Sequence, residues 1–390
     1  MGRNKRGRGR GRGRGGAARG GGEPEGRQPA GNVPGIIKGK DKQRNQQSQR
    51  GGGRGGRGSA RSQRQSGKSS KKSGRLQVDA VVEEVLEEGI RRHQEIVKAH
   101  SDAVMAIAIT EDCIYTGSRD KTLKRWKPLP TPSGRFELRP DVEVPLGEQC
   151  LCLVVVGEWL FCGLSTGNIR GFAKSGKEMT LTGHTKKCSA LLVHQHVLIS
   201  GGGDATVRCW QMDPATQNFT CTHSITEGIP GSVNSLTALG EYLWIGGTSG
   251  VSVVELASLR VVSQLAPKKF VASFLPYEGH IIVSYVDGSS CIFDGQGNQK
   301  LQQQPLAAGP VMCMAGLELG PRMLCGHAKG QVSSVELPGF VLRKYWQALE
   351  RCKVQSIACT PGQDGMFIVG GENGSLQLWQ RDPARVACEL

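Results

Sequence analysis

The chain has 390 residues and a formal net charge of +16, which comes from one end of the sequence. Residues 1–75 hold 22 lysines and arginines against 3 aspartates and glutamates, so residues 76–390 carry a net charge of −3. No apolar segment follows the first basic residues as in a secretory signal, and the longest apolar run, Cys150–Val156, is too short to span a bilayer. The composition therefore argues against a membrane protein and a secreted protein.

Residues 1–75 are predicted to form a disordered tail, because they contain 22 of the 56 glycines and no Phe, Tyr or Trp. Arginine alternates with glycine in Arg8–Gly16 and recurs among glycines in Gly51–Gly58. A guanidinium group binds phosphate and stacks on bases, while glycine lets the backbone follow a nucleic-acid strand. We therefore expect non-specific RNA binding, and the alternative is a solubilising or methylated tail. The expected RNA contacts are Arg8, Arg10, Arg12, Arg14, Arg54 and Arg57.

Residues 76–93 are predicted to be a linker with a short amphipathic helix. Apolar residues recur there at helical spacing among four glutamates. They are Val78, Val81, Val82, Val85, Leu86 and Ile90.

A strand–turn–strand unit recurs along residues 94–381, and its clearest copies are Tyr115–Trp126, Ile199–Trp210 and Ile368–Trp379. The residue after the first strand stands at 117, 163, 201, 246, 284, 326 and 370. These intervals of 38 to 46 residues are close to the roughly 40–45 of one propeller blade. Four residues past that position, five of the seven copies have glycine, as a tight hairpin turn requires.

An apolar-x-x-apolar pattern precedes each unit and predicts the innermost strand of a blade. Seven units predict an all-β, seven-bladed β-propeller. Glu95–Ala99 has no earlier blade to join, so we expect it to supply the outer strand of the last blade and close the ring. Residues 382–390 are then a short C-terminal tail.

Two of the units contain a histidine, a hydroxyl residue, an aspartate and a tryptophan at equivalent positions. They are His100, Thr116, Asp120 and Trp126, and His184, Ser200, Asp204 and Trp210. A hydrolase triad is one interpretation, but repetition at equivalent positions favours a structural chain of hydrogen bonds. No nucleophile elbow, phosphate-binding loop or H-E-x-x-H is present. We therefore predict no enzyme, no cofactor, no metal and no small-molecule substrate.

The 13 cysteines all lie at or after Cys113 and form no C-x-x-C pair. This pattern predicts free thiols in a reducing compartment, the nucleus or the cytoplasm.

The residue before each predicted turn is expected to face the upper mouth of the ring. The seven residues are Arg119, Ser165, Gly203, Thr248, Val286, Ala328 and Glu372. Such a mixed set suits a protein or peptide better than nucleic acid. Arg119, Thr248 and Glu372 are the expected partner contacts. Lys174, Lys177, Lys186 and Lys187 flank the start of the third unit and are candidate phosphate contacts.

From about residue 94 to 380 the sequence resembles a WD40 repeat domain. The resemblance rests on Ala99–His100, Gly183–His184 and the Gly-x-x-Asp-x-Thr signatures that end at Trp126 and Trp210. Gly157–Gly163, Glu336–Phe340 and Gly371–Trp379 are similar to the propeller of proteins that pair a CCCH zinc finger with WD40 repeats. A finger of that family needs three cysteines and a histidine, and no cysteine precedes Cys113. The resemblance therefore implies the propeller and not the zinc site.

These observations predict a non-catalytic scaffold. Its propeller binds proteins and its arginine- and glycine-rich tail binds RNA. The alternative is an adaptor that binds only proteins, in ubiquitin ligation, trafficking or signalling.

Overall fold

The structure is a computed structural model that describes residues 89–132, 136–303, 309–317, 320–361 and 365–382. The predicted tail, residues 1–75, lies outside these residues, as do residues 76–88 of the predicted linker and residues 383–390. The described residues form seven four-stranded antiparallel sheets and no helix. They are therefore all-β.

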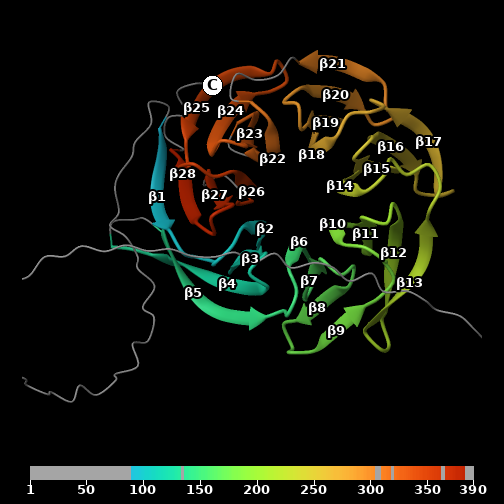
Figure 1. Cartoon of the computed structure of the whole chain (residues 1–390), viewed down its shortest axis with the longest axis horizontal. Coiled ribbons are helices and arrows are strands. Elements are labelled where there is room, and N and C mark those ends of the chain that lie inside the picture. The colour runs from blue at the N-terminus through green and yellow to red at the C-terminus, as the bar shows by residue number, and fades with distance from the viewer. Residues whose placement is uncertain (1–88, 133–135, 304–308, 318–319, 362–364, 383–390) are drawn as a thin grey trace, which may run out of the picture. The chain divides into compact units, whose positions relative to one another are not determined.

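Each sheet is one blade of a ring (Figure 1). The first blade contains β2 (Val104–Ile109), β3 (Ile114–Ser118), β4 (Thr122–Pro130) and β5 (Phe136–Pro145), and the second β6 (Cys150–Val156), β7 (Trp159–Leu164), β8 (Ile169–Ala173) and β9 (Glu178–Leu181). The third contains β10 (Cys188–His194), β11 (Val197–Gly202), β12 (Val207–Asp213) and β13 (Asn218–Ile225), and the fourth β14 (Val233–Leu239), β15 (Tyr242–Gly247), β16 (Gly250–Glu255) and β17 (Arg260–Leu265). The fifth contains β18 (Val271–Tyr277), β19 (His280–Tyr285), β20 (Ser290–Asp294) and β21 (Gln299–Gln303), and the sixth β22 (Val311–Leu317), β23 (Arg322–His327), β24 (Gln331–Glu336) and β25 (Val341–Gln347). The seventh contains β26 (Val354–Cys359), β27 (Met366–Gly371), β28 (Leu376–Arg381) and β1 (Ile90–Ile96).

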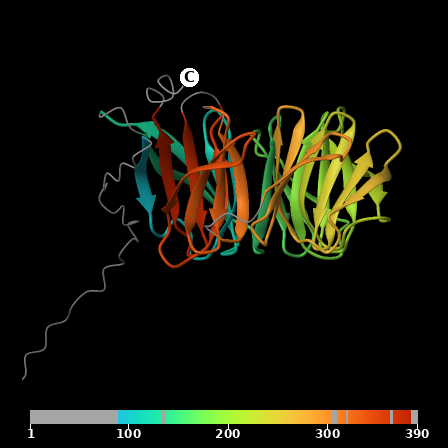
Figure 2. The ribbon, with the colours of Figure 1, turned by 90° about the horizontal axis from the view of Figure 1, so that it is seen from above.

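The inner strands of neighbouring blades contact one another all the way round, and β26 returns to β2. The strands run between the two faces of the ring (Figure 2). We call the upper face the one that carries the turn between the second and third strands of each blade. The link from each outer strand to the next inner strand lies on the same face, because antiparallel strands alternate in direction.

The ring is closed by β1, which pairs antiparallel with β28 from Ile90↔Arg381 to Ile96↔Leu376. The predicted closure is therefore present, but its strand starts five residues earlier than Glu95. The assignment of Ile90 to a helix was wrong, and the propeller begins at residue 90 rather than 94. Ile90 is 1% exposed in the core between the sixth and seventh blades, so long-range pairing and burial override the helical spacing.

The inner strands share two features that the repeat pattern predicted in part. The first residue of each is completely buried, and the next residue forms a β-bulge in all seven blades. The buried residues are Val104, Cys150, Cys188, Val233, Val271, Val311 and Val354. A bulge adds one unpaired residue and bends the strand, so the same local geometry recurs at the upper end of every blade.

The predicted turn residues adopt positive φ in all seven blades. Five are glycines, and the other two are Lys121 (φ 70°) and Ala205 (φ 59°). At Gly374 a Cβ would lie only 2.1 Å from the carbonyl oxygen of His100, so this turn needs glycine for space as well as for its backbone angle.

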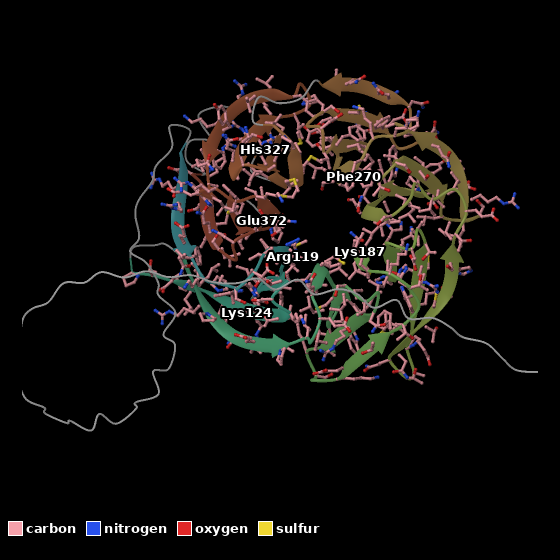
Figure 3. All side chains as sticks on the ribbon, viewed as in Figure 1. Arg119, Lys124, Lys187, Phe270, His327 and Glu372 are labelled. Carbon is pink, nitrogen blue, oxygen red and sulfur yellow. The ribbon has the colours of Figure 1, made fainter. Side chains whose placement is uncertain are left out.

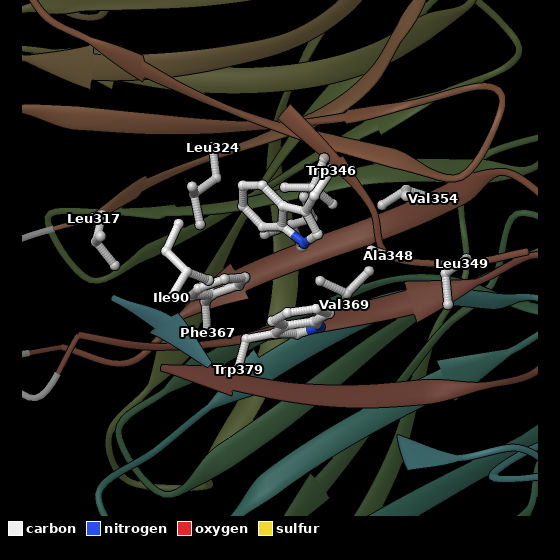
Figure 4. Close-up of a cluster of buried hydrophobic side chains, with 12 residues drawn as sticks. Ile90, Leu317, Leu324, Trp346, Ala348, Leu349, Val354, Phe367, Val369 and Trp379 are labelled. Carbon is white, nitrogen blue, oxygen red and sulfur yellow. The ribbon is translucent and has the colours of Figure 1, made fainter. Parts of the chain in front are cut away.

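The core lies between neighbouring blades rather than at one centre. Figure 4 shows the cluster shared by the sixth and seventh blades. In it Trp379 packs against Trp346 and Phe367, with ring centroids 5.8 and 6.2 Å away, and all three side chains are buried. Each blade therefore depends on its neighbours for the burial of its apolar faces.

Candidate functional site

The upper ends of the inner strands form the mouth of the ring, where one hydrogen-bonded arrangement recurs in all seven blades. In every blade the residue before the turn donates its backbone N–H to the carbonyl oxygen of the residue before the inner strand, at 2.7 to 3.2 Å. The donor–acceptor pairs are Arg119–Ala103, Ser165–Gln149, Gly203–Lys187, Thr248–Ser232, Val286–Phe270, Ala328–Pro310 and Glu372–Lys353. Rigid strands thus present fourteen residues, and we call these fourteen residues the mouth.

Sequence reasoning found the donor row of the mouth and missed the acceptor row. The missed residues include Phe270 and Lys353, whereas Lys187 was predicted only as a phosphate contact. A signal for them exists, because the acceptor lies directly before the first apolar residue of each inner strand. It precedes its donor by 16 residues in five of the seven blades.

One sector of the mouth is charged. Lys353 Nζ contacts Glu372 Oε1 at 2.9 Å, and their backbones are joined by the hydrogen bond described above. The hydrogen bond from Lys353 holds the pKa of Glu372 below its ordinary value, and the positive charge of Arg119 acts in the same direction. The structure therefore brings together two of the three predicted contacts, Arg119 and Glu372, on one side of the ring centre (Figure 3).

The third predicted contact, Thr248, belongs to another sector. It is exposed and paired with Ser232 in the fourth blade. Its neighbours along the ring are Lys187 in the third blade and Phe270 in the fifth, and both lie across the ring centre from Glu372 in Figure 3. The mouth therefore has a charged sector and a separate sector that contains lysine, threonine and phenylalanine.

The four lysines proposed as phosphate contacts are divided between the two faces. Lys174 and Lys177 lie in the turn between β8 and β9, whereas Lys186 and Lys187 lie in the link between β9 and β10. The strand β9 separates the two pairs, so they cannot form one patch. Residues at the two ends of one strand lie on opposite faces although they are near one another in sequence. Phosphate binding by either pair stays a prediction.

Both hydrogen-bonded tetrads are present. Trp126 Nε1 donates to Thr116 Oγ1 at 2.8 Å, Thr116 Oγ1 lies 2.7 Å from His100 Nε2, and His100 Nδ1 lies 2.9 Å from Asp120 Oδ2. In the third blade the distances are 2.9 Å from Trp210 to Ser200, 2.8 Å from Ser200 to His184 and 3.1 Å from His184 to Asp204.

The environment of these tetrads is that of a structural device. Thr116 and Ser200 are 0% exposed, so no substrate reaches either hydroxyl. Burial opposes the ionisation of Asp120, but hydrogen bonds from His100 and Thr122 outweigh it and hold its pKa well below the usual range. Asp120 also accepts the backbone N–H of Ser101 at 3.0 Å. The tetrad therefore ties the turn of the blade to the link before its inner strand.

A third buried histidine, His327, was not predicted as a site residue. It is 0% exposed, with Nε2 2.8 Å from Ser333 Oγ and Nδ1 3.1 Å from the carbonyl oxygen of Gly309. Burial lowers the pKa of His327 below its ordinary 6.5, and burial likewise lowers the pKa of His184. Both side chains are therefore neutral parts of the upper face at neutral pH.

Acidification from pH 7.5 to 5.5 is expected to lower the urea midpoint of unfolding. The folded pKa values of His184 and His327 lie below the unfolded value of 6.5, so the unfolded chain binds more protons in this range. Their contribution is complete above pH 6.5 and is lost as the pH falls toward the folded values. His327→Gln should reduce this pH dependence, whereas His223→Gln, at an exposed histidine, should not. An unchanged slope for His327→Gln would contradict the assignment.

Within the described part of the chain, no group of three His, Cys, Asp or Glu side chains is placed to hold a metal, and no helix is long and apolar enough to cross a membrane. The twelve cysteines described are free thiols. The predicted RNA contacts, Arg8, Arg10, Arg12, Arg14, Arg54 and Arg57, lie outside the described residues.

Comparison with known proteins agrees with the repeat structure. The family described as "WD domain, G-beta repeat" matches residues 91–127 and 176–211, the segments that contain the two tetrads. Zinc finger CCCH domain-containing protein 17 of Oryza sativa subsp. japonica is 23% identical over 73% of this chain and 65% of its own length. Zinc finger CCCH domain-containing protein 59 of Arabidopsis thaliana is 24% identical over 73% of this chain and 60% of its own length. The chain thus spans less than two thirds of each of these relatives.

A solved structure gives the same fold. The WD40 β-propeller domain of Doa1 superimposes with a TM-score of 0.61 at 16% identity, over 73% of this chain and 95% of that one. The chain therefore contains segments that match WD40 repeats, folds as a seven-bladed β-propeller and is distantly similar to CCCH zinc finger proteins.

Proposed function

We propose that the chain is a non-catalytic scaffold whose mouth binds a protein partner and whose N-terminal tail binds RNA without sequence preference. WD40 propellers are generally protein-interaction scaffolds, and they are generally non-catalytic. The observation that supports protein binding is the mixed chemistry of the mouth, which holds lysine, arginine, glutamate, phenylalanine and threonine on seven equivalent backbone supports. A surface for nucleic acid would be more uniformly basic.

The RNA half of the proposal rests on the composition of residues 1–75. A net charge of +19 with repeated Arg-Gly steps favours phosphate binding through the release of condensed counterions. The propeller itself is close to neutral, since residues 76–390 carry a net charge of −3. The two halves of the function would therefore reside in separate parts of the chain.

Removal of residues 1–75 is expected to lower the affinity for a labelled single-stranded poly(U) by at least about 100-fold at 50 mM salt. For six phosphate contacts, the affinity of the full chain should itself fall about 300-fold between 50 and 200 mM salt. Fluorescence anisotropy measures both effects. Changing Arg8, Arg10, Arg12, Arg14, Arg54 and Arg57 to Gln should lower the affinity, and the matched change to Lys, which keeps the charge, should largely preserve the salt dependence.

An adaptor that binds only proteins is the second candidate. It predicts equal poly(U) affinity with and without residues 1–75, and partners that stay bound to the chain after RNase treatment. Equal affinity in the anisotropy measurement would reject the RNA half and leave the docking of proteins intact.

A further inference from the structure

The sector of the mouth opposite Glu372 combines unpaired positive charge with an exposed aromatic ring. Two links build it, the one before β10 with Lys186 and Lys187 and the one before β18 with Lys268 and Phe270. We call these four residues the basic–aromatic arc. Lys187 and Phe270 lie on the same side of the ring centre in Figure 3.

The three lysines of the arc differ from Lys269 and Lys353 in having no counter-charge. Lys186, Lys187 and Lys268 are exposed, and none forms an ion pair with the residues that the structure describes. In contrast, Lys269 contacts Asp287 at 3.0 Å and Lys353 contacts Glu372 at 2.9 Å.

No acidic side chain in the described part of the chain forms an ion pair with the lysines of the arc, and Asp204 is engaged by His184. Asp287 is engaged by Lys269, whose ammonium also lies 4.9 Å from the centre of the Tyr285 ring. Glu227 lies in the link between β13 and β14. It lines a hollow with Arg260 and Val261 of the outer strand β17, away from the inner strands. The arc therefore offers free positive charge to a partner.

The aromatic side chain of the arc is held rigidly but not covered. Phe270 is 45% exposed, although its carbonyl oxygen accepts the backbone N–H of Val286 at 3.0 Å and the next residue, Val271, is completely buried. The following blade adds Pro310 and Ala328 at the equivalent positions. The fifth and sixth blades thus present four apolar residues of the mouth, and Lys268 lies in the link that leads into the fifth blade.

We propose that the basic–aromatic arc binds an acidic peptide segment of a protein partner. An apolar side chain of that segment packs against Phe270, Val286 and Pro310, and its carboxylates face Lys186, Lys187 and Lys268. This proposal rests on the proposed docking function of the mouth and names the chemistry of the partner. It favours a peptide over RNA, because surfaces that bind single strands present several stacking rings, whereas the arc contains one aromatic ring, that of Phe270.

The test is a selection of phage-displayed random nonapeptides on the full chain, followed by affinity measurement with a synthesised peptide from the selection. We expect enrichment of Asp and Glu around one Phe, Leu, Ile or Trp. Lys186→Glu with Lys187→Glu should weaken binding of that peptide at least tenfold, and so should Phe270→Ala. The control is Lys174→Glu with Lys177→Glu, which makes the same change of charge at the other face and should alter the affinity less than twofold. Unchanged urea midpoints show that each variant is folded.

The outcomes separate this proposal from the docking function. The selected peptides could instead be neutral or basic, and Arg119→Ala or Glu372→Ala could abolish their binding. That result would overturn the proposal for the arc and leave the docking function intact. If both pairs of lysine substitutions weaken the binding of an acidic peptide equally, the peptide is attracted by the general positive charge of the chain, which also overturns the arc. If the arc variants weaken poly(U) and not the peptide, the arc is an RNA surface and the proposal is wrong. No enrichment at all would reject both proposals.

Discussion

A chain that begins at residue 97 is expected to unfold at a much lower urea concentration than one that begins at residue 89, or to fail to fold. The first lacks β1 and leaves β28 as an open edge, whereas the second keeps all 28 strands. Ile90 and Ile96 are 1% and 3% exposed, and burial of each contributes about 1.5–3 kcal/mol. Together with the lost strand pairing, the expected cost of about 5 kcal/mol approaches the whole stability of a typical domain.

Removal of β1 is expected to destabilise the first blade as well as the seventh. The side chain of Gln94 in β1 donates to the carbonyl oxygen of Leu138 at 3.3 Å and accepts the backbone N–H of Leu138 at 2.7 Å. It therefore occupies both backbone groups of one residue in β5. An open ring would release these groups as well as the exposed edge of β28, and open edges promote aggregation.

Two point substitutions test, without truncating the chain, whether β1 stabilises the closed ring. Ile96→Asp places a carboxylate in the core cluster shared by the seventh and first blades, whereas Val97→Asp, at a residue that is 40% exposed, makes the same chemical change at the surface. Circular dichroism and tryptophan fluorescence in urea measure both. Equal midpoints for Ile96→Asp and Val97→Asp would show that the closing strand is not needed for stability.

The fold was predictable because its signals are local and repeated seven times. The buried first residue of each inner strand and the positive-φ turn residue stand at nearly constant spacing, so each copy supports the others. The bounds of β1 were not predictable in the same way. Its partner β28 lies almost 300 residues away, and no local pattern at Ile90 indicates that pairing. Its apolar side chain fits a helix and a strand equally well.

Only one of the two rows of residues in the mouth could be predicted from the sequence, because the other row depends on pairing between separate segments. Its donor row follows from the turn signature, which is read from one segment. Its acceptor row depends on a hydrogen bond between two separate segments of each blade. Phe270 was therefore missed as a site residue, since an apolar residue before an apolar strand is usually interpreted as part of the core, and only its position 16 residues before Val286 indicates its place in the mouth. The tetrads, by contrast, were fully predictable, because their four residue types are distinctive and recur in two blades.

Thr116→Val is expected to destabilise the propeller by about 2–4 kcal/mol, although it replaces one side chain with another of almost equal size. The Thr116 hydroxyl is the only link in the tetrad between the indole of Trp126 and the imidazole of His100. Its removal leaves a buried N–H donor and a buried nitrogen acceptor unpaired. An unpaired buried polar group costs about 1–3 kcal/mol, whereas the methyl group that replaces the hydroxyl contributes little.

The matched control is Thr116→Ser, which keeps the hydroxyl and loses only a methyl group, and the urea midpoint measures the difference between the two variants. Ser200→Ala makes the same test in the third blade, where the hydroxyl is also completely buried. If Thr116→Val and Thr116→Ser have equal midpoints, the hydroxyl does not stabilise the blade. A structural role for the tetrad would then lose its physical basis, because a buried chain of polar groups that adds no stability would need another reason to recur at the same position in two blades.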